Sequence, residues 1–256
     1  MSGFSSVDDS ADPAGLVRFL DAAATAESGM KQYAVAAHAL RRPARPVLDL
    51  GCGAGHDLVL FATAGLSVVG LDPSAVMAEH ARARTADVGT PILRGTGEAL
   101  PCRDGALAGC RMERVLMHVD DPIVVLAEVL RCLQRGGLVT VFEPDWSAFR
   151  VKSEVLSDRV GWLSAAKHPD IGAKLWELMD ELGCDVLDRV EELSVWRSLG
   201  TLKRVAGFPL AVERAVAAGR IRRADADRWI DEQLRREAAG EFFALMPKIL
   251  VVATKR

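Results

Sequence analysis

The sequence predicts a single α/β domain in which helices cover a mostly parallel sheet. Short apolar runs of the kind that form buried strands alternate with stretches of helical spacing between residues 47 and 143. The chain has 256 residues, of which 50% are hydrophobic, so it can bury a sizeable core. No repeat, low-complexity tract or proline- and serine-rich linker divides the sequence, which favours one domain over two.

The central part of the sequence predicts five strands and three helices. The apolar run VLDL lies between Pro46 and Gly51, which suits a strand buried on both faces. Pro73 and Pro122 stand where a first helical turn accepts proline, and Gly136-Gly137 is expected to end the third helix. The expected strands are 47–50, 66–72, 91–95, 105–112 and 138–143, and the expected helices begin near Gly55 and cover 73–84 and 122–135.

The two flanks of this block have a different pattern. Residues 12–40 carry apolar positions at helical spacing, and so does the stretch from 151 to 183. Residues 185–199 alternate in part like a strand, and 201–239 predicts two amphipathic helices separated by Gly219. A last strand is expected over 248–254.

Charge and cysteine content exclude several classes of protein. The formal net charge is −3 and the pI is near 6.0, which argues against a general nucleic-acid binder because such proteins carry a strong basic excess. The five cysteines are scattered and form no CxxC pair, so we expect neither a disulfide framework nor a metal site. The first thirty residues contain no apolar run long enough for a signal core or a membrane span. We therefore expect a cytoplasmic protein with no membrane or nucleic-acid partner.

Three glycines at alternating positions follow the first predicted strand. Where a strand turns into a helix, glycines let the backbone approach a ligand closely, and the helix amino end adds a positive potential. The common dinucleotide fingerprint is G-x-G-x-x-G, but here Gly51-Cys52-Gly53-Ala54-Gly55 is followed by His56, so the third glycine comes one position early. Asp72 ends the next predicted strand, where a carboxylate can accept two hydrogen bonds from a ribose diol. The glycine loop and Asp72 together predict a nucleotide-like ligand.

Several of these segments resemble one enzyme family. The pattern D-x-G-x-G-x-G, which begins at Asp49, resembles motif I of the class I S-adenosylmethionine-dependent methyltransferases. The stretch GTGEALPCRDGALAGCRMERVLMHVDDP is similar to conserved blocks of the ubiquinone/menaquinone-biosynthesis type, and LRCLQRGGLVTVFEPDW looks like the helix, double glycine and fifth strand of that type. The resemblance covers about residues 45–150. HPDIGAKLWELMDELGC is weakly similar to small-molecule methyltransferases of bacterial secondary metabolism.

The resemblance implies a Rossmann-like fold with a mostly parallel seven-stranded sheet, flanking helices and helical cap elements, and S-adenosylmethionine as cofactor. Within one domain it implies a helical cap at 1–44, a cofactor-binding core at 45–150, and acceptor-side helices with the last strands at 151–256. Asp72 would hold the ribose, and Thr96 stands where the family usually has an aspartate. The other implied cofactor residues are Asp49, Gly51, Cys52, Gly53 and Gly55 at the methionine end, Pro73 and Met77 at the adenine, and Gly97, Glu98 and Ala99 on its other side.

Methyl transfer is an in-line displacement, so alignment supplies much of the rate, and a base is needed only if the acceptor must lose a proton. Glu113, Arg114 and His118 follow the predicted strand 105–112, at the sheet edge where the methyl group should point. Glu113 and Arg114 are also candidates to contact the cofactor. His118 is the first candidate for a general base, because an unperturbed imidazole titrates near neutrality. A histidine held by the local backbone is the alternative interpretation.

Further candidates lie outside this segment. Glu143 ends the fifth predicted strand and is the second catalytic candidate, while Asp145 and Trp146 beside it could frame a planar or cationic acceptor. Ordinary loop polarity is the alternative. His168 and Tyr33, the chain's only tyrosine, are candidates for acceptor contact, with a turn and a buried structural tyrosine as the alternatives.

Three functions remain open from the sequence. The leading hypothesis is a methyltransferase that acts on a small molecule, as a monomer or a homodimer; the acceptor atom cannot be read from the residues. An NAD(P)-dependent oxidoreductase is opposed by the glycine spacing and by the lack of a Tyr-x-x-x-Lys pair, since Ala37 stands four residues after Tyr33. The third hypothesis is an S-adenosylmethionine-binding protein that does not methylate, and Thr96 keeps it open.

Overall fold

The computed structural model describes residues 7–10, 12–24 and 28–256. Its centre is a sheet of eight strands in the order β3-β2-β1-β4-β5-β8-β6, with β7 paired to β8. The strands are β1 Val47–Leu50, β2 Val68–Asp72, β3 Ile92–Arg94, β4 Leu107–Glu113, β5 Leu133–Pro144, β6 Arg150–Val151, β7 Cys184–Trp196 and β8 Ala244–Lys255. The predicted α/β architecture is confirmed, with one strand more than the seven that we expected.

The first five strands in this order run parallel, and β8 is antiparallel to its neighbours. β7 pairs with β8 along its whole length, from Cys184 opposite Lys255 to Trp196 opposite Ala244. Because β7 occupies one edge of β8, β5 and the short β6 both pair with its other edge. The additional strand β6 therefore continues the line of β5 beyond the parallel part of the sheet.

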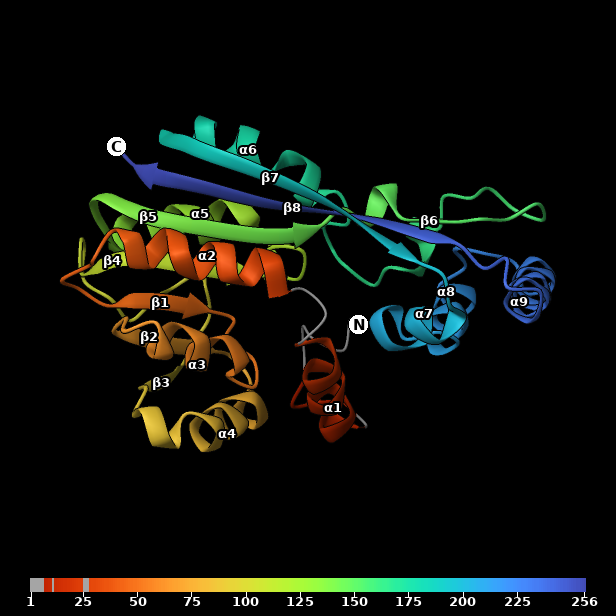
Figure 1. Cartoon of the computed structure of the whole chain (residues 1–256), viewed down its shortest axis with the longest axis horizontal. Helices are drawn as coiled ribbons and strands as arrows, with labels where there is room; N and C mark the ends of the chain where they lie inside the picture. Colours follow the sequence, from red (N-terminus) through yellow and green to blue (C-terminus); the bar gives the residue numbers. More distant parts are fainter. Residues whose placement is uncertain (1–6, 11, 25–27) are drawn as a thin grey trace.

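Helices cover both faces of the sheet (Figure 1). On one face, α5 and α6 pack on inward-facing residues of β5 and β8, such as Val141 and Val251. On the other face, α3 and α4 pack on β1, β2 and β3, and Met30 of α2 packs on Phe142 and Leu250. The helices are α1 Pro13–Ala23, α2 Ser28–Leu40, α3 His56–Thr63, α4 Ala75–Arg84, α5 Pro122–Cys132, α6 Ile171–Glu181, α7 Leu199–Ala206, α8 Leu210–Ala217 and α9 Arg223–Ala238.

A second hydrophobic core lies beyond the end of β5. Phe149, Val151 and Leu163 pack there against Trp229 of α9 and Phe242. We call this part, made of residues 149–163 and 197–243, the lobe. Figure 1 shows that β7 and β8 extend from the main sheet into the lobe, and that α1 lies between the lobe and the main sheet.

Three expectations about the helices were wrong. Residues 151–183 are regular helix only in α6, because the apolar side chains before it, such as Val160 and Leu163, enter the lobe core from extended chain and a short 3-10 turn. Residues 201–239 belong to three helices, because the chain breaks between α7 and α8 at Gly207 and Pro209. The segment 12–40 is helical as expected, in the two helices α1 and α2, and residues 25–27 between them lie outside the described residues.

The third error concerns the end of α5. The helix ends at Cys132, and the glycine pair that we expected to stop it lies inside β5. Gly136 has a φ of 70°, and the pairing of β4 with β5 shifts register between Leu107 and Gly109. The glycines therefore accommodate a bulge in the strand.

Candidate active site

The carboxyl ends of the five parallel strands meet at one edge of the sheet, which is where open α/β sheets bind ligands. The loop after β1 takes its shape from Gly51, Gly53 and Gly55, whose φ angles are 70°, 51° and 82°. A Cβ on Gly51 would lie 2.5 Å from Cγ2 of Val115, and one on Gly55 would lie 2.9 Å from the Ala81 Cα. The loop therefore needs glycine both for its backbone angles and for its contacts.

Asp72 lies beside this loop at the end of β2. Its Oδ2 accepts a hydrogen bond of 2.9 Å from the Gly53 N–H, and its Oδ1 accepts one of 2.9 Å from the Ser74 N–H. Burial raises the pKa of the carboxyl, although these two N–H groups partly offset the effect. Each carboxylate oxygen has a second lone pair, so Asp72 can still accept from a ribose diol. Met77 is buried close by in α4, and Pro73 is exposed.

The segment after β3 forms the next part of the same edge. Gly97 is buried, and a Cβ there would lie 2.8 Å from Cγ1 of Val125 in α5. Thr96 and Ala99 are exposed, and Glu98 is half-buried. Thr96 and Glu98 are thus the polar side chains that this segment offers to a ligand.

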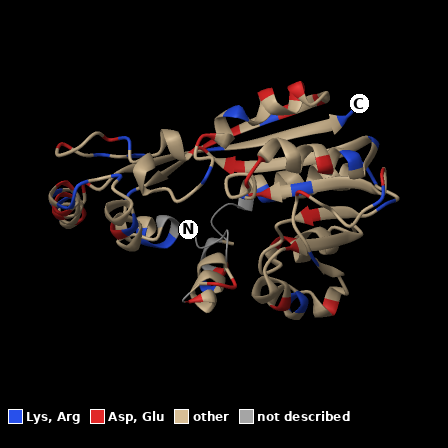
Figure 2. Cartoon of the chain, turned by 180° about the vertical axis from the view of Figure 1, so that it is seen from behind, with Lys and Arg blue, Asp and Glu red and all other residues tan. Residues whose placement is uncertain are grey.

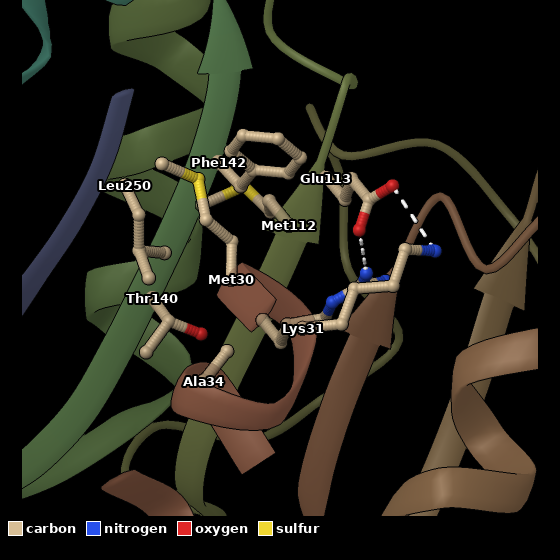
Figure 3. A pocket seen from close by; sticks show the side chains of 9 residues that line it. Met30, Lys31, Ala34, Met112, Glu113, Thr140, Phe142 and Leu250 are labelled. Atoms are coloured by element: carbon tan, nitrogen blue, oxygen red, sulfur yellow. Dashed lines mark hydrogen bonds and ion pairs between the residues drawn. The ribbon is translucent and has the colours of Figure 1, made fainter. Parts of the chain in front are cut away.

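A buried ionic network lies under the glycine loop, and the sequence did not predict it. Arg111 of β4 contacts Asp49 of β1 at 2.8 Å, and it also pairs with Asp57 and Glu113. Lys31 of α2 lies 3.0 Å from Asp57 and 3.3 Å from Glu113. Figure 3 shows Lys31 directed toward Glu113, beside an apolar wall formed by α2 and the sheet. The network ties α2 to the loops after β1 and β4.

The charges in this network balance. Arg114 is the third cation of the network, besides Lys31 and Arg111, and its guanidinium lies 2.6 Å from the Glu113 carboxylate. Three cations therefore face the carboxylates Asp49, Asp57 and Glu113. Burial raises the pKa of Asp49 to about 6, against the effect of Arg111. Burial also opposes ionisation of Glu113, but the three cations outweigh it and hold its pKa low. Cys52, which lies in the glycine loop, stays a thiol because burial raises its pKa.

The segment before β1 folds over the start of α4. Asp8 accepts hydrogen bonds from the Ser74 hydroxyl and from the backbone N–H groups of Ala75 at 2.8 Å and Val76 at 3.3 Å. A carboxylate at this place is favoured because the first N–H groups of a helix have no partner within it. Asp8 therefore caps α4 next to Asp72.

Helix α1 covers the glycine loop itself. Asp21 lies 2.8 Å from Nε2 of His56 and 2.7 Å from the Arg84 guanidinium, so it joins α1 to α3 and α4. The Leu20 side chain reaches within 3.1 Å of the place where a Gly53 Cβ would stand. Val7 and Val17 of the covering segment also pack in a buried apolar cluster with Ala54 of the glycine loop and Met77 of α4.

The turn after β4 carries the first catalytic candidate. Arg114 has a φ of 55°, which is rare for a residue other than glycine and turns the chain away from the strand. The His118 N–H then donates to the Val115 carbonyl at 2.9 Å. Burial, Arg114 and Lys167 lower the pKa of His118 to about 4. The imidazole is therefore uncharged at neutral pH.

Glu143 lies next to this turn, at the end of β5. Its side chain is 0% exposed, and its Oε1 accepts hydrogen bonds from the backbone N–H groups of Val115 at 2.8 Å and Leu116 at 2.7 Å. Asp145 follows it, and its Oδ1 accepts from the backbone N–H groups of Ser147 at 3.0 Å and Ala148 at 3.2 Å, which supports a short 3-10 turn. The contacts of Glu143 hold the end of β5 and the turn after β4 together.

Trp146 and His168 belong to the chain after β5 and lie at the same edge of the sheet. Trp146 is half-buried and packs against both the main core and the lobe core. Nε2 of His168 lies 3.1 Å from the carbonyl oxygens of both Val119 and Asp120. Because carbonyl oxygens only accept, Nε2 carries the proton and holds this segment to the β4 turn. The sheet edge therefore brings together His118, Glu143, Trp146 and His168.

Tyr33 is the predicted site residue that lies apart from this group. It is 41% exposed on α2, and its hydroxyl donates to Asp188 in the middle of β7. Lys31 of the same helix instead joins the ionic network under the glycine loop. Among the described residues, we find no group of His, Cys, Asp or Glu side chains that could hold a metal ion.

The arrangement defines a class of protein: a parallel α/β sheet with a glycine-lined loop after the first strand and a carboxylate at the end of the second. Comparison with known proteins identifies the family. Residues 48–141 match the model of a methyltransferase domain. The chain is 34% identical over 252 residues to an uncharacterized 37.1 kDa protein in transposon TN4556 of Streptomyces fradiae, and the match covers 93% of this chain and 70% of that protein.

Two other similarities agree with this match. An uncharacterized methyltransferase of Mycolicibacterium gilvum is 35% identical over 100 residues, and this match spans 39% of the length of each protein. The solved YcgJ protein from Bacillus subtilis has the same fold, with a TM-score of 0.61 at 16% identity over 88% of this chain and 99% of that chain. The chain belongs to the class I S-adenosylmethionine-dependent methyltransferases.

The residues present fit S-adenosylmethionine as cofactor. The glycine loop offers a cradle that any Cβ at Gly51 or Gly55 would disturb, and Asp72 keeps acceptor capacity for a ribose. Asp49 has one carboxylate oxygen, Oδ2, without a hydrogen-bond partner among the described residues. It is buried under the loop, at the end of the site where the resemblance places the methionine part.

Proposed function

We propose that this protein transfers the methyl group of S-adenosylmethionine to a small molecule held between the sheet edge and the lobe. The observation that carries the proposal is that the turn with His118 contacts the glycine loop through Val115 and Gly51, and is bonded through Glu143 to the end of β5, where Trp146 follows. The acceptor-binding candidates thus lie next to the cofactor loop. Figure 2 shows acidic and basic residues interspersed along helices such as α9, which suits a small acceptor better than a nucleic acid.

Each part of the chain has its own role in this proposal. Residues 45–150 hold the cofactor, with Asp72 on the ribose, Met77 and Pro73 at the adenine, and Glu113 with Arg114 at the methionine end. The segment before β1 covers the cofactor, a role supported by the contacts of Asp8 and Asp21. The lobe and the segment with His168 supply the acceptor side.

Methyl transfer requires few catalytic groups from the protein. The cofactor, when bound, supplies a methyl group activated by a sulfonium. The chain orients the acceptor and excludes water, and its lobe core and half-buried Trp146 suit both tasks. His118 takes the proton of the acceptor if one must leave. Because its pKa is near 4, it is a weak base and suits an acidic, phenol-like hydroxyl better than an alcohol.

The experiment is a screen for transfer of tritiated methyl groups from labelled S-adenosylmethionine. The small-molecule fraction of a Streptomyces culture serves as the acceptor pool, and matched protein and nucleic-acid fractions serve as alternatives. We expect label in the small-molecule fraction, and less of it with the Asp72→Ala variant at a subsaturating concentration of the cofactor. Label only in macromolecules would overturn the acceptor class. Tight cofactor binding without transfer to any fraction would favour a protein that binds the cofactor without methylating.

We further propose that the protein works in the cytoplasm as a monomer or a homodimer. The five cysteines are all free thiols, which agrees with a reducing compartment. Among the described helices, none is long and apolar enough to cross a bilayer. Light scattering coupled to size-exclusion chromatography would distinguish the two oligomeric states.

A further inference from the structure

We propose that Glu143 is a positioning residue whose carboxyl stays protonated and holds the turn that carries His118. The inference rests on the proposed function of His118, but its test does not depend on methyl transfer. Glu143 was a catalytic candidate in the sequence, so the proposal gives it a different role from that of a base.

The position of Glu143 in β5 explains its burial. Val139, Val141 and Glu143 alternate along the strand and face the same core, which is covered by α5 and α6. The partner of Glu143 on β8 is Ile249, which is also buried there. A Cβ on Gly172 of α6 would lie 3.1 Å from the Glu143 carbonyl oxygen, so that helix closes tightly over the strand end.

The carboxyl acts on the turn through one oxygen. Arg114 leaves β4 with its N–H bonded to the Phe142 carbonyl at 2.9 Å, and its positive φ then directs the next two N–H groups toward Glu143. Oε1 accepts from both of them, as a side chain does at the start of a helix. Without that acceptor, both buried N–H groups would lose their partner.

The second oxygen shows the protonation state. Oε2 is buried and has no hydrogen-bond partner among the described residues. An ionised oxygen at such a place would be costly, since nothing replaces its hydration. Burial raises the pKa of Glu143 to about 8, with Glu113 acting in the same direction and the N–H groups of Leu116 and Val115 and the charge of Arg114 opposing it.

Other charged groups stand on the elements around the carboxyl. Asp145 follows it on the same strand, and Lys248 of β8 pairs with Pro144. On the α6 side, Lys174 lies 2.5 Å from Asp170 at the helix start and is thereby paired. These groups do not change the assignment, since the charges that act most on the pKa of Glu143 are those of Arg114 and Glu113.

The turn also touches the cofactor loop, because Val115 packs on Gly51. The two N–H groups held by Glu143 belong to Val115 itself and to Leu116. Glu143 therefore controls the placement of His118 and of the contact with the glycine loop together.

The experiment compares Glu143→Gln and Glu143→Met with the wild-type protein and with Glu192→Gln, an exposed control in β7. The His118 imidazole is followed by NMR titration, with His118→Asn used to assign it. S-adenosylhomocysteine binding is measured by calorimetry. We expect Glu143→Gln, whose amide oxygen still accepts, to keep the pKa of His118 within about 0.5 of wild type. Glu143→Met should raise it toward 6.5 and weaken binding about tenfold or more, as the loss of two buried N–H partners implies.

Infrared spectroscopy of the wild-type protein tests the protonation of the Glu143 carboxyl directly, so this measurement does not depend on whether a variant folds. A band of a protonated carboxylic acid should be present at neutral pH, should disappear as the pH passes about 8, and should be missing in Glu143→Gln. An ionised Glu143 at neutral pH would overturn the proposal. So would a His118 titration and an affinity that are unchanged in Glu143→Met. Equal losses in Glu143→Gln and Glu143→Met would show that the ionisable group itself is required.

Discussion

Arg111 and Asp49 face each other on the neighbouring strands β4 and β1, and their side chains meet at 2.8 Å where neither is open to solvent. The same guanidinium reaches Asp57 and Glu113. One cation thus connects the strand before the glycine loop, the helix after it and the end of β4. The geometry of the cofactor loop depends on a buried charge balance.

Removing Arg111 should strongly destabilise the protein. Arg111→Met leaves three buried carboxylates with only Lys31 and Arg114, and breaking a buried ion pair from one side costs about 3 to 5 kcal/mol. Urea denaturation measures the loss in the free energy of unfolding. Arg189→Ala is the control, because its pair with Glu191 is exposed and should contribute about 1 kcal/mol or less. A small effect of Arg111→Met would show that water reaches the network.

Asp72→Ala should weaken the binding of S-adenosylhomocysteine by about 1.5 to 3 kcal/mol, the scale of hydrogen bonds to a charged group. Titration calorimetry measures this directly. Asp9→Ala, at a nearby exposed aspartate, is the control and should bind like wild type. Wild-type affinity in Asp72→Ala would contradict a ribose contact at this carboxylate.

Turnover should fall at low pH with an apparent pKa near 4 rather than 6.5, because burial, Arg114 and Lys167 favour the neutral form of His118. For an acceptor that must lose a proton, His118→Ala should reduce turnover about 100-fold or more. The exposed His80→Ala is the control. A loss of less than about threefold, with the acidic limb unchanged, would make His118 a structural residue.

Deleting residues 1–24 should leave a folded core that binds the cofactor product at least about tenfold more weakly, since α1 and Asp8 cover the loop and the start of α4. Turnover should be lost with the cover. Circular dichroism checks the fold, and calorimetry measures the affinity. Arg18→Ala changes only an exposed pair within α1 and should have no effect. Unchanged affinity and turnover in the truncated protein would refute a covering role.

Glu143→Gln should be more stable than wild type at pH 8, and the difference should shrink toward pH 4.5. The folded-state pKa of Glu143 is raised from 4.5 to about 8, so between these values the unfolded chain loses the proton while the folded protein keeps it. Wild-type stability therefore falls as the pH rises through this window, by an amount on the order of 5 kcal/mol at most. Denaturation at several pH values checks this. A difference that is independent of pH would mean that Glu143 ionises normally.

The sequence alone determined the strand and helix pattern of the core, because that pattern is local. VLDL, the glycine loop and Asp72 follow one another along the chain, and each has a physical signal within a few residues: a buried strand, a turn with positive φ, and an acid at a strand end. Even the burial of Glu143 was visible in principle, since Val139, Val141 and Glu143 share one face by alternation.

Only the tertiary structure decided how distant charges and flanks combine. Arg111 and Lys31 had no partner pattern in the sequence, because Asp49, Asp57 and Glu113 come from other elements and meet them only through strand register and helix packing. The stretch 151–183 was misjudged for the same reason: its apolar residues, such as Val160 and Leu163, pack in the lobe core rather than along a helix face. Periodicity reports local geometry, whereas packing between segments far apart in the chain determines which side chains meet.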